Sequence, residues 1–169
     1  MSFFDLATAR YSVRRYADTP VEADKLAAIL EAARIAPTAG NRQPHRVLVV
    51  QDPDGLAKID LCTRSRNAAP LALLVCYDRD ACWVRPADGE NSGQVDASII
   101  TTHMMLQAQE LGIGSLWVMH FDPIIAAEQF TLAENLVPVA ILMLGYAADD
   151  SAPTERHSDR QSIEQMLIS

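Results

Sequence analysis

The sequence feature that most constrains the fold is a long apolar segment at residues 96–111, which has the spacing of a helix. Apolar side chains occupy almost every side of this helix: Ile99, Ile100, Met104, Met105, Leu106, Ala108 and Leu111. Because a helix that is apolar nearly all round must be covered by other parts of a protein, we expect it to be central and buried. Gly112 is suited to end it, since glycine adopts the left-handed conformation common after the last helical turn.

Shorter apolar runs on both sides of this helix predict a sheet. Strands are expected at residues 46–51, 71–77, 115–121 and 137–145, and further helices at 2–10, 22–35, 52–62, 123–130 and 162–168. The run LALLVCY at 71–77 is apolar at every position, which indicates a strand buried on both faces. The wide spacing of the strands disfavours simple hairpins. We therefore expect an α+β fold with a central sheet covered by helices, formed as a single domain over residues 1–169.

The composition excludes several kinds of protein. The 169 residues carry a formal net charge of −8, and a nucleic-acid-binding surface would need to be basic. The first ten residues lack the order of a signal peptide, and no apolar run approaches the length of a membrane span. The three cysteines have no CxxC spacing, which is typical of free thiols in a reducing cytosol, and we interpret Cys76 as a core residue. We expect a cytoplasmic protein with no nucleic-acid or membrane partner.

A cluster of positive charge stands out in this acidic chain. The stretch RYSVRRY at residues 10–16 holds three arginines, with Ser12 between Arg10 and Arg14. Two guanidiniums and a hydroxyl on a short extended segment are suitable groups for holding a phosphate. The alternative is a solvated charged turn after the first helix, since most charge runs lie on protein surfaces.

Other common functional motifs do not occur in the sequence. There is no phosphate-loop pattern, no GxGxxG and no GxSxG, and the GIG at 112–114 follows a helix rather than opening one, which disfavours a dinucleotide-binding fold. The four histidines show neither HExxH nor paired-ligand spacing, so no metal site is expected. We interpret His103 as a hydrogen-bonded core residue. His120 could be either a core residue or part of a pocket. Trp83 is a large aromatic residue in a polar loop, and we expect it to cover part of the molecule.

Several motifs occur in the order found in one enzyme family. The set comprises Arg-x-Ser-x-Arg-x-aromatic at 10–16, Ala-Pro-Thr-x-x-Asn-x-Gln-Pro at 36–44, Leu-Gly-Ile-Gly-Ser at 111–115, Trp117-Val118, Phe121-Asp122, Leu-Gly-Tyr at 144–146, and a late basic segment with Arg156, His157 and Arg160. With this set the chain resembles the FMN-dependent nitroreductase family, in its short form, over nearly its whole length. His45 departs from the family pattern, which has an aromatic residue there, and so does Met119-His120, where relatives have small or acidic residues.

The resemblance implies a homodimer with one FMN in each of two clefts, each cleft built from both subunits. The long apolar helix would then serve self-association. By similarity, Arg10, Ser12 and Arg160 would hold the FMN phosphate, with Tyr11 and His157 beside them. Arg14 would lie near the pyrimidine edge of the flavin, where it stabilises the reduced ring. The residues expected to line the flavin ring are Pro37, Thr38, Ala39 and Asn41.

The resemblance also implies a reaction. NAD(P)H would pass hydride to the flavin and leave, and a nitroaromatic, quinone or similar electron-poor acceptor would then be reduced in the same space. No catalytic side chain is expected, because the flavin performs the chemistry. The alternatives are a flavin-binding or storage protein without turnover, a dehalogenating or flavin-modifying relative on the same scaffold, and an anion-binding module that takes up no flavin.

Overall fold

An antiparallel sheet forms the centre of the molecule. The computed structural model describes residues 2–168. Its four strands, in the spatial order β1-β2-β4-β3, are β1 (His45–Val50), β2 (Leu71–Asp78), β4 (Leu136–Gly145) and β3 (Gly114–Val118). Every neighbouring pair is antiparallel. Consecutive strands are joined through helices rather than tight turns, so the expectation of no simple hairpin among these strands is confirmed.

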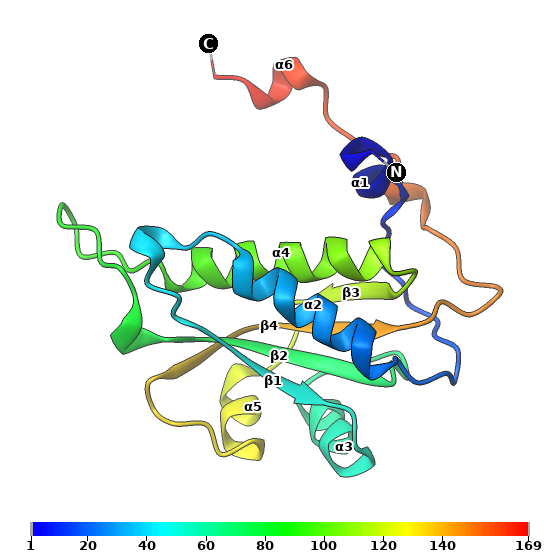
Figure 1. The fold of residues 1–169 in the computed structure, drawn as a ribbon, viewed down its shortest axis with the longest axis horizontal. Coiled ribbons are helices and arrows are strands. Elements are labelled where there is room, and N and C mark those ends of the chain that lie inside the picture. Colours follow the sequence, from blue (N-terminus) through cyan, green and yellow to red (C-terminus); the bar gives the residue numbers. More distant parts are fainter. Residues whose placement is uncertain (1, 169) are drawn as a thin grey trace.

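Helices cover both faces of this sheet, as Figure 1 shows. One face carries α2 (Ala23–Ile35) and α4 (Gly93–Glu110), and the other carries α3 (Pro53–Cys62) and α5 (Pro123–Gln129). Two short helices, α1 (Phe3–Ala9) and α6 (Ile163–Met166), lie near the chain ends, and single 3-10 turns occur at Ala39–Asn41, Arg79–Ala81 and Glu155–His157. The predicted α+β arrangement, a central sheet covered by helices, is confirmed.

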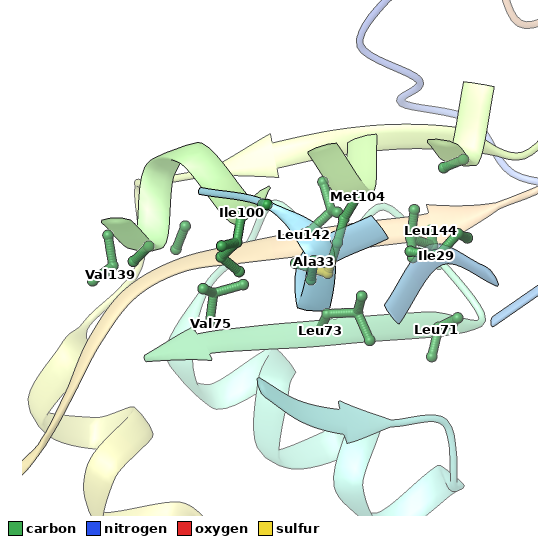
Figure 2. Close-up of a cluster of buried hydrophobic side chains, with 14 of the residues drawn as sticks. Ile29, Ala33, Leu71, Leu73, Val75, Ile100, Met104, Val139, Leu142 and Leu144 are labelled. Carbon is green, nitrogen blue, oxygen red and sulfur yellow. The ribbon is translucent and has the colours of Figure 1, made fainter. Parts of the chain in front are cut away.

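The continuous apolar run of β2 serves two cores at once. Alternate side chains of a strand point to opposite faces of the sheet. Leu71, Leu73 and Val75 join the core under α2 and α4, where Figure 2 shows them with Ile100 and Met104. Ala72, Leu74 and Cys76 join the core toward α3 and α5. Cys76 is therefore a core residue as expected, and its burial raises the pKa of its thiol to about 12.

The long helix α4 is central but covered on one side. Ala97, Ile100, Met104 and Ala108 are buried, and the cluster they join lies over the sheet. Val95 on another side is 62% exposed. With Ile99 and Thr102 it lines an open groove along the helix. The apolar pattern runs round the whole helix, and a single chain covers only part of it.

Two boundaries differ from the sequence prediction by three residues, and the other differences are of one or two residues. The helix α4 begins at Gly93, three residues before the predicted start, following Ser92. The strand β3 ends at Val118, whereas the prediction continued to Phe121, which was wrong. The amide of Phe121 donates to the carbonyl of Met119, so the chain turns there before Asp122 caps α5.

The N-terminal segment extends the sheet at one end. The amide of Val13 donates to the carbonyl of Ser115 in β3 (2.9 Å), and the amide of Ala17 donates to the carbonyl of Tyr146, just after β4 (2.9 Å). A Cβ on Gly114 would lie 2.6 Å from a methyl carbon of Val13, so glycine is needed there for the two segments to meet. This pairing fixes the extended course of residues 10–16.

No helix within residues 2–168 has both the length and the apolar character needed to cross a membrane.

Candidate functional site

The arginine stretch presents three alternate side chains, together with Tyr11, to a hollow at the surface. Val13 is buried, and Arg10, Ser12 and Arg14, at alternate positions around it, line the same hollow of about 190 Å³. In extended chain, residues two apart lie on the same side. Arg15 is not part of that lining; it forms an ion pair with Asp150 and is largely exposed. The spacing Arg-x-Ser-x-Arg thus places these three side chains on one side of an extended segment.

The C-terminal tail completes this hollow. The tail contributes Thr154, Arg156, His157 and Arg160, and the one further lining residue is Tyr11 of the arginine stretch. We call this space the arginine hollow. Arg10 and Arg160, from opposite ends of the chain, therefore line the same hollow. Sequence reasoning did not place Arg156 in the candidate site, although it noted the basic segment that contains this residue.

Two contacts join the tail to the N-terminal segment. The ring of His157 places Nε2 3.1 Å from the carbonyl oxygen of Thr8 and meets the ring of Tyr11 edge-on, with 6.5 Å between ring centroids. The hydroxyl of Tyr11 donates to the hydroxyl oxygen of Ser151 (3.3 Å). His157 and Tyr11 thus line the hollow while their polar atoms hold its two walls together.

The charge in the arginine hollow is unbalanced. Burial and then the nearby charge of Arg160 lower the pKa of Arg10 from its ordinary value. Among residues 2–168, Arg10, Arg14 and Arg160 form no ion pair with a carboxylate. An anion in this hollow would relieve the repulsion between guanidiniums and accept charge-assisted hydrogen bonds. A phosphate has the charge and the acceptor oxygens for this role.

The second predicted group, the loop of residues 37–43, has an unusual backbone. Gly40, Asn41 and Gln43 all adopt positive φ angles, at 56°, 53° and 50°. The amide of Gln43 donates to the Thr38 hydroxyl oxygen (3.0 Å), and its side chain donates to the Asn41 carbonyl (3.2 Å). Thr38 keeps its hydroxyl proton, and Asn41 keeps its amide donors, for other partners. Pro37 and Asn41 are exposed, and Thr38 and Ala39 are half-buried.

A buried carboxylate holds this loop in place. Asp96 lies in the first turn of α4 and is only 1% exposed. One carboxylate oxygen accepts from the Ala39 amide (2.8 Å), and the other accepts from the Ser92 hydroxyl (2.7 Å). Sequence reasoning used Asp96 only to mark the start of a helix. An acidic residue at the head of an otherwise apolar helix is the signal that could have found it, because buried carboxylates need hydrogen-bond partners.

Trp83 covers the turn of the same loop, in line with the sequence expectation. A Cβ placed on Gly40 would lie 3.5 Å from the Trp83 ring. The carbonyl of Trp83 accepts from the amide of Ser92 (2.9 Å), next to the start of α4. The loop is thus supported by Asp96 from α4 and by an aromatic side chain.

Two further histidines, His103 and His120, take no part in either group. His103 is hydrogen-bonded as expected, with Nδ1 2.9 Å from the Ile99 carbonyl oxygen, but it is only half-buried. His120 is exposed and borders a hollow between α3 and α5, on the face of the sheet opposite α4.

The two groups of candidate residues lie at opposite ends of α4. The loop is bonded to the first turn of this helix through Asp96, and the arginine segment is bonded to Ser115, just beyond its last turn. Eighteen residues of helix separate them, about 27 Å at a rise of about 1.5 Å per residue. Figure 1 shows the loop near one end of α4 and α1 near the other. Within one chain these two groups of candidate residues, which we call the candidate half-sites, do not meet.

The Asp96 contact gives a first prediction. Replacing Asp96 with alanine removes both carboxylate bonds and leaves the Ala39 amide without its partner, which should lower the free energy of unfolding by about 1–3 kcal/mol. Urea unfolding measures this loss, and hydrogen exchange should be faster at the Ala39 amide. In the control Ser92→Ala the loop contact remains, so Ala39 should stay protected. Unchanged exchange at Ala39 in Asp96→Ala would show that the carboxylate does not hold the loop.

Comparison with known proteins identifies the family of this chain. The model of the nitroreductase family matches residues 7–72 and 66–146. A solved structure of a nitroreductase family protein from Clostridium difficile 630 is 46% identical, with a TM-score of 0.94 over 99% of this chain and 98% of that one. A relative from Archaeoglobus fulgidus, provisionally named NADH dehydrogenase/NAD(P)H nitroreductase, is 31% identical over 83% of each chain. The FMN reductase (NAD(P)H) of Bacillus subtilis is 30% identical over 88% of this chain and 67% of its own length. The chain belongs to the nitroreductase family.

Proposed function

We propose that this protein is an FMN-dependent oxidoreductase that transfers hydride from NADH or NADPH through bound FMN to a nitroaromatic, a quinone or a similar flat, electron-poor acceptor. The observation that carries the proposal is the arginine hollow, in which Arg10, Ser12 and Arg160 converge from the two ends of the chain. The names of the relatives support it, since one is an FMN reductase and another an NAD(P)H nitroreductase.

The residues of the hollow fit an FMN phosphate. The pKa of Arg10 is lowered by its partial burial and by the positive charge of Arg160. The negative charge of a bound phosphate would act against both effects. Ser12 adds a hydroxyl at the position between Arg10 and Arg14. Guanidiniums bind phosphate oxygens through two parallel hydrogen bonds, which orients the group as well as attracting it. These residues would hold the phosphate end of the cofactor.

FMN, when bound, supplies the hydride-accepting and electron-donating chemistry. Arg14, exposed at the same hollow, would contribute positive charge suited to the negative charge that develops on a reduced ring. Thr38 and Asn41 contribute hydrogen-bonding groups from the loop, and Gly40 has no side chain to hinder a close approach. No side chain is assigned as acid, base or nucleophile. We place the activity in the cytosol, where the three free cysteines would stay reduced.

We further propose that the complete site forms between two copies of the chain. When the two-fold axis of a dimer is perpendicular to a helix, that helix and its copy run in opposite directions, and we propose this arrangement for α4. The start of one α4 then lies near the end of its copy, so the loop of one chain meets the arginine hollow of the other. The open side of α4, with Val95, Ile99 and Thr102, provides a surface for this contact.

The chain ends offer further surface for the same partner. The apolar side chains of α1 and α6 are exposed in one chain: Phe3, Phe4, Ile163 and Met166. Soluble proteins rarely expose large apolar patches without a partner to cover them. A second copy that covers these helices would also hold the tail against the arginine hollow.

The proposed activity predicts a yellow protein that releases FMN on denaturation. Under anaerobic conditions its flavin absorbance should bleach on titration with NADH or NADPH and return on addition of a nitroaromatic or quinone. A protein that carries flavin without bleaching with either nucleotide would be a storage protein. One that purifies without flavin and takes none up would be an anion-binding module.

The phosphate assignment predicts the effect of one substitution. Arg10→Ala should weaken FMN binding by about 1.5–3 kcal/mol, because it removes a charge-assisted contact. Equilibrium dialysis or flavin fluorescence measures the change. Arg15→Ala is the matched control, since Arg15 belongs to the same stretch but pairs with Asp150 outside the hollow, and it should bind FMN as wild type does. Equal FMN affinity in the two variants would remove Arg10 from the site.

A further inference from the structure

We propose that a second hollow, beside the arginine hollow, binds a phosphate group of the incoming nicotinamide dinucleotide. This outer hollow has a volume of about 470 Å³ and is lined by Arg14, Thr154, Glu155 and Arg156. The inference rests on the proposed function, because it assigns a place to the donor of that reaction.

The first support is the number of charges. Four guanidiniums line the two hollows together, from Arg10, Arg14, Arg156 and Arg160, against the single carboxylate of Glu155. Within residues 2–168, none of these four arginines forms an ion pair. One phosphate monoester carries at most two negative charges near neutral pH. The cluster therefore has positive charge left after the FMN phosphate is bound.

The second support is the division of the side chains between the hollows. Arg10, Ser12 and Arg160 line the inner, smaller space, whereas Arg14, Thr154 and Arg156 line both. Arg10 and Ser12 are half-buried, while Arg14, Arg156 and Arg160 are exposed. Partly buried groups suit a phosphate that stays bound. Exposed arginines attract anions weakly and reversibly, which suits a donor that leaves after each turnover.

The chemistry of the donor matches the outer hollow in two ways. Both reduced dinucleotides carry a diphosphate, and NADPH carries a further phosphate on its adenosine ribose. Either group would accept hydrogen bonds from Arg156 and Arg14 and from the hydroxyl of Thr154. Both donors offer an anionic phosphate to the outer hollow. Comparing NADH with NADPH shows whether the hollow binds the diphosphate or the ribose phosphate.

The test is Arg156→Ala in the flavin-loaded protein. Stopped-flow reduction under anaerobic conditions, at several NADH and NADPH concentrations, gives the Kd of each donor and the limiting rate. We expect the donor Kd to rise about fivefold to tenfold. The Kd for FMN should rise by a smaller factor, because Arg156 also lines the arginine hollow. A rise for NADPH alone identifies the ribose phosphate, and an equal rise for both identifies the diphosphate. Arg156→Lys should recover much of the loss, and the dependence of Kd on salt should be weaker in Arg156→Ala than in wild type.

Arg64→Ala is the matched control, because Arg64 is an exposed arginine beside α3, outside both hollows. It should leave both donor Kd values unchanged. Unchanged donor Kd values in Arg156→Ala would overturn the inference. So would loss of FMN with an unchanged donor Kd, since that result assigns Arg156 to the FMN phosphate. Failure of the proposed function is distinct, because wild-type protein would then show no flavin reduction by either donor.

Discussion

The pairing of residues 10–16 with the end of the sheet decides where the charged groups of this protein lie. Hydrogen bonds from Val13 to Ser115 and from Ala17 to the carbonyl of Tyr146 hold the segment extended. An extended backbone turns Arg10, Ser12 and Arg14 to one side, and the C-terminal tail brings Arg160 to the same hollow. An acidic chain with a net charge of −8 thereby gathers Arg10, Arg14, Arg156 and Arg160 around one hollow.

The same fold keeps the two candidate half-sites apart. The helix α4 connects them, with Asp96 holding the loop at its start and the arginine segment bound beyond its end. Its apolar residues face the sheet on one side and remain open on another. Self-association through the open side would join the half-sites, so in this account the sequence of one helix serves the core, the dimer and the cofactor site together.

Local patterns predicted much of this arrangement. The apolar runs identified the strands and the main helices, and the spacing of Arg10, Ser12 and Arg14 identified the phosphate-binding candidate. Features that depend on distant contacts could not be predicted in this way. Asp96 marks a helix start in the sequence, and only the folded loop shows that its carboxylate is buried against the Ala39 amide. Likewise, only the course of the tail shows that Arg156 faces the same space as Arg14.

The central claim is that each FMN site combines the arginine hollow of one chain with the loop of the other. It is tested most directly by pairing an Arg10→Ala chain with an Asp96→Ala chain, each carrying a different affinity tag, and by counting tight FMN sites in the purified mixed dimer. If the two halves of each site come from different chains, one site of the mixed dimer carries both substitutions and the other carries none. One FMN per dimer should then bind with wild-type affinity. If each site is built within one chain, every site carries one substitution, and the absence of any wild-type site in the mixed dimer would contradict the account.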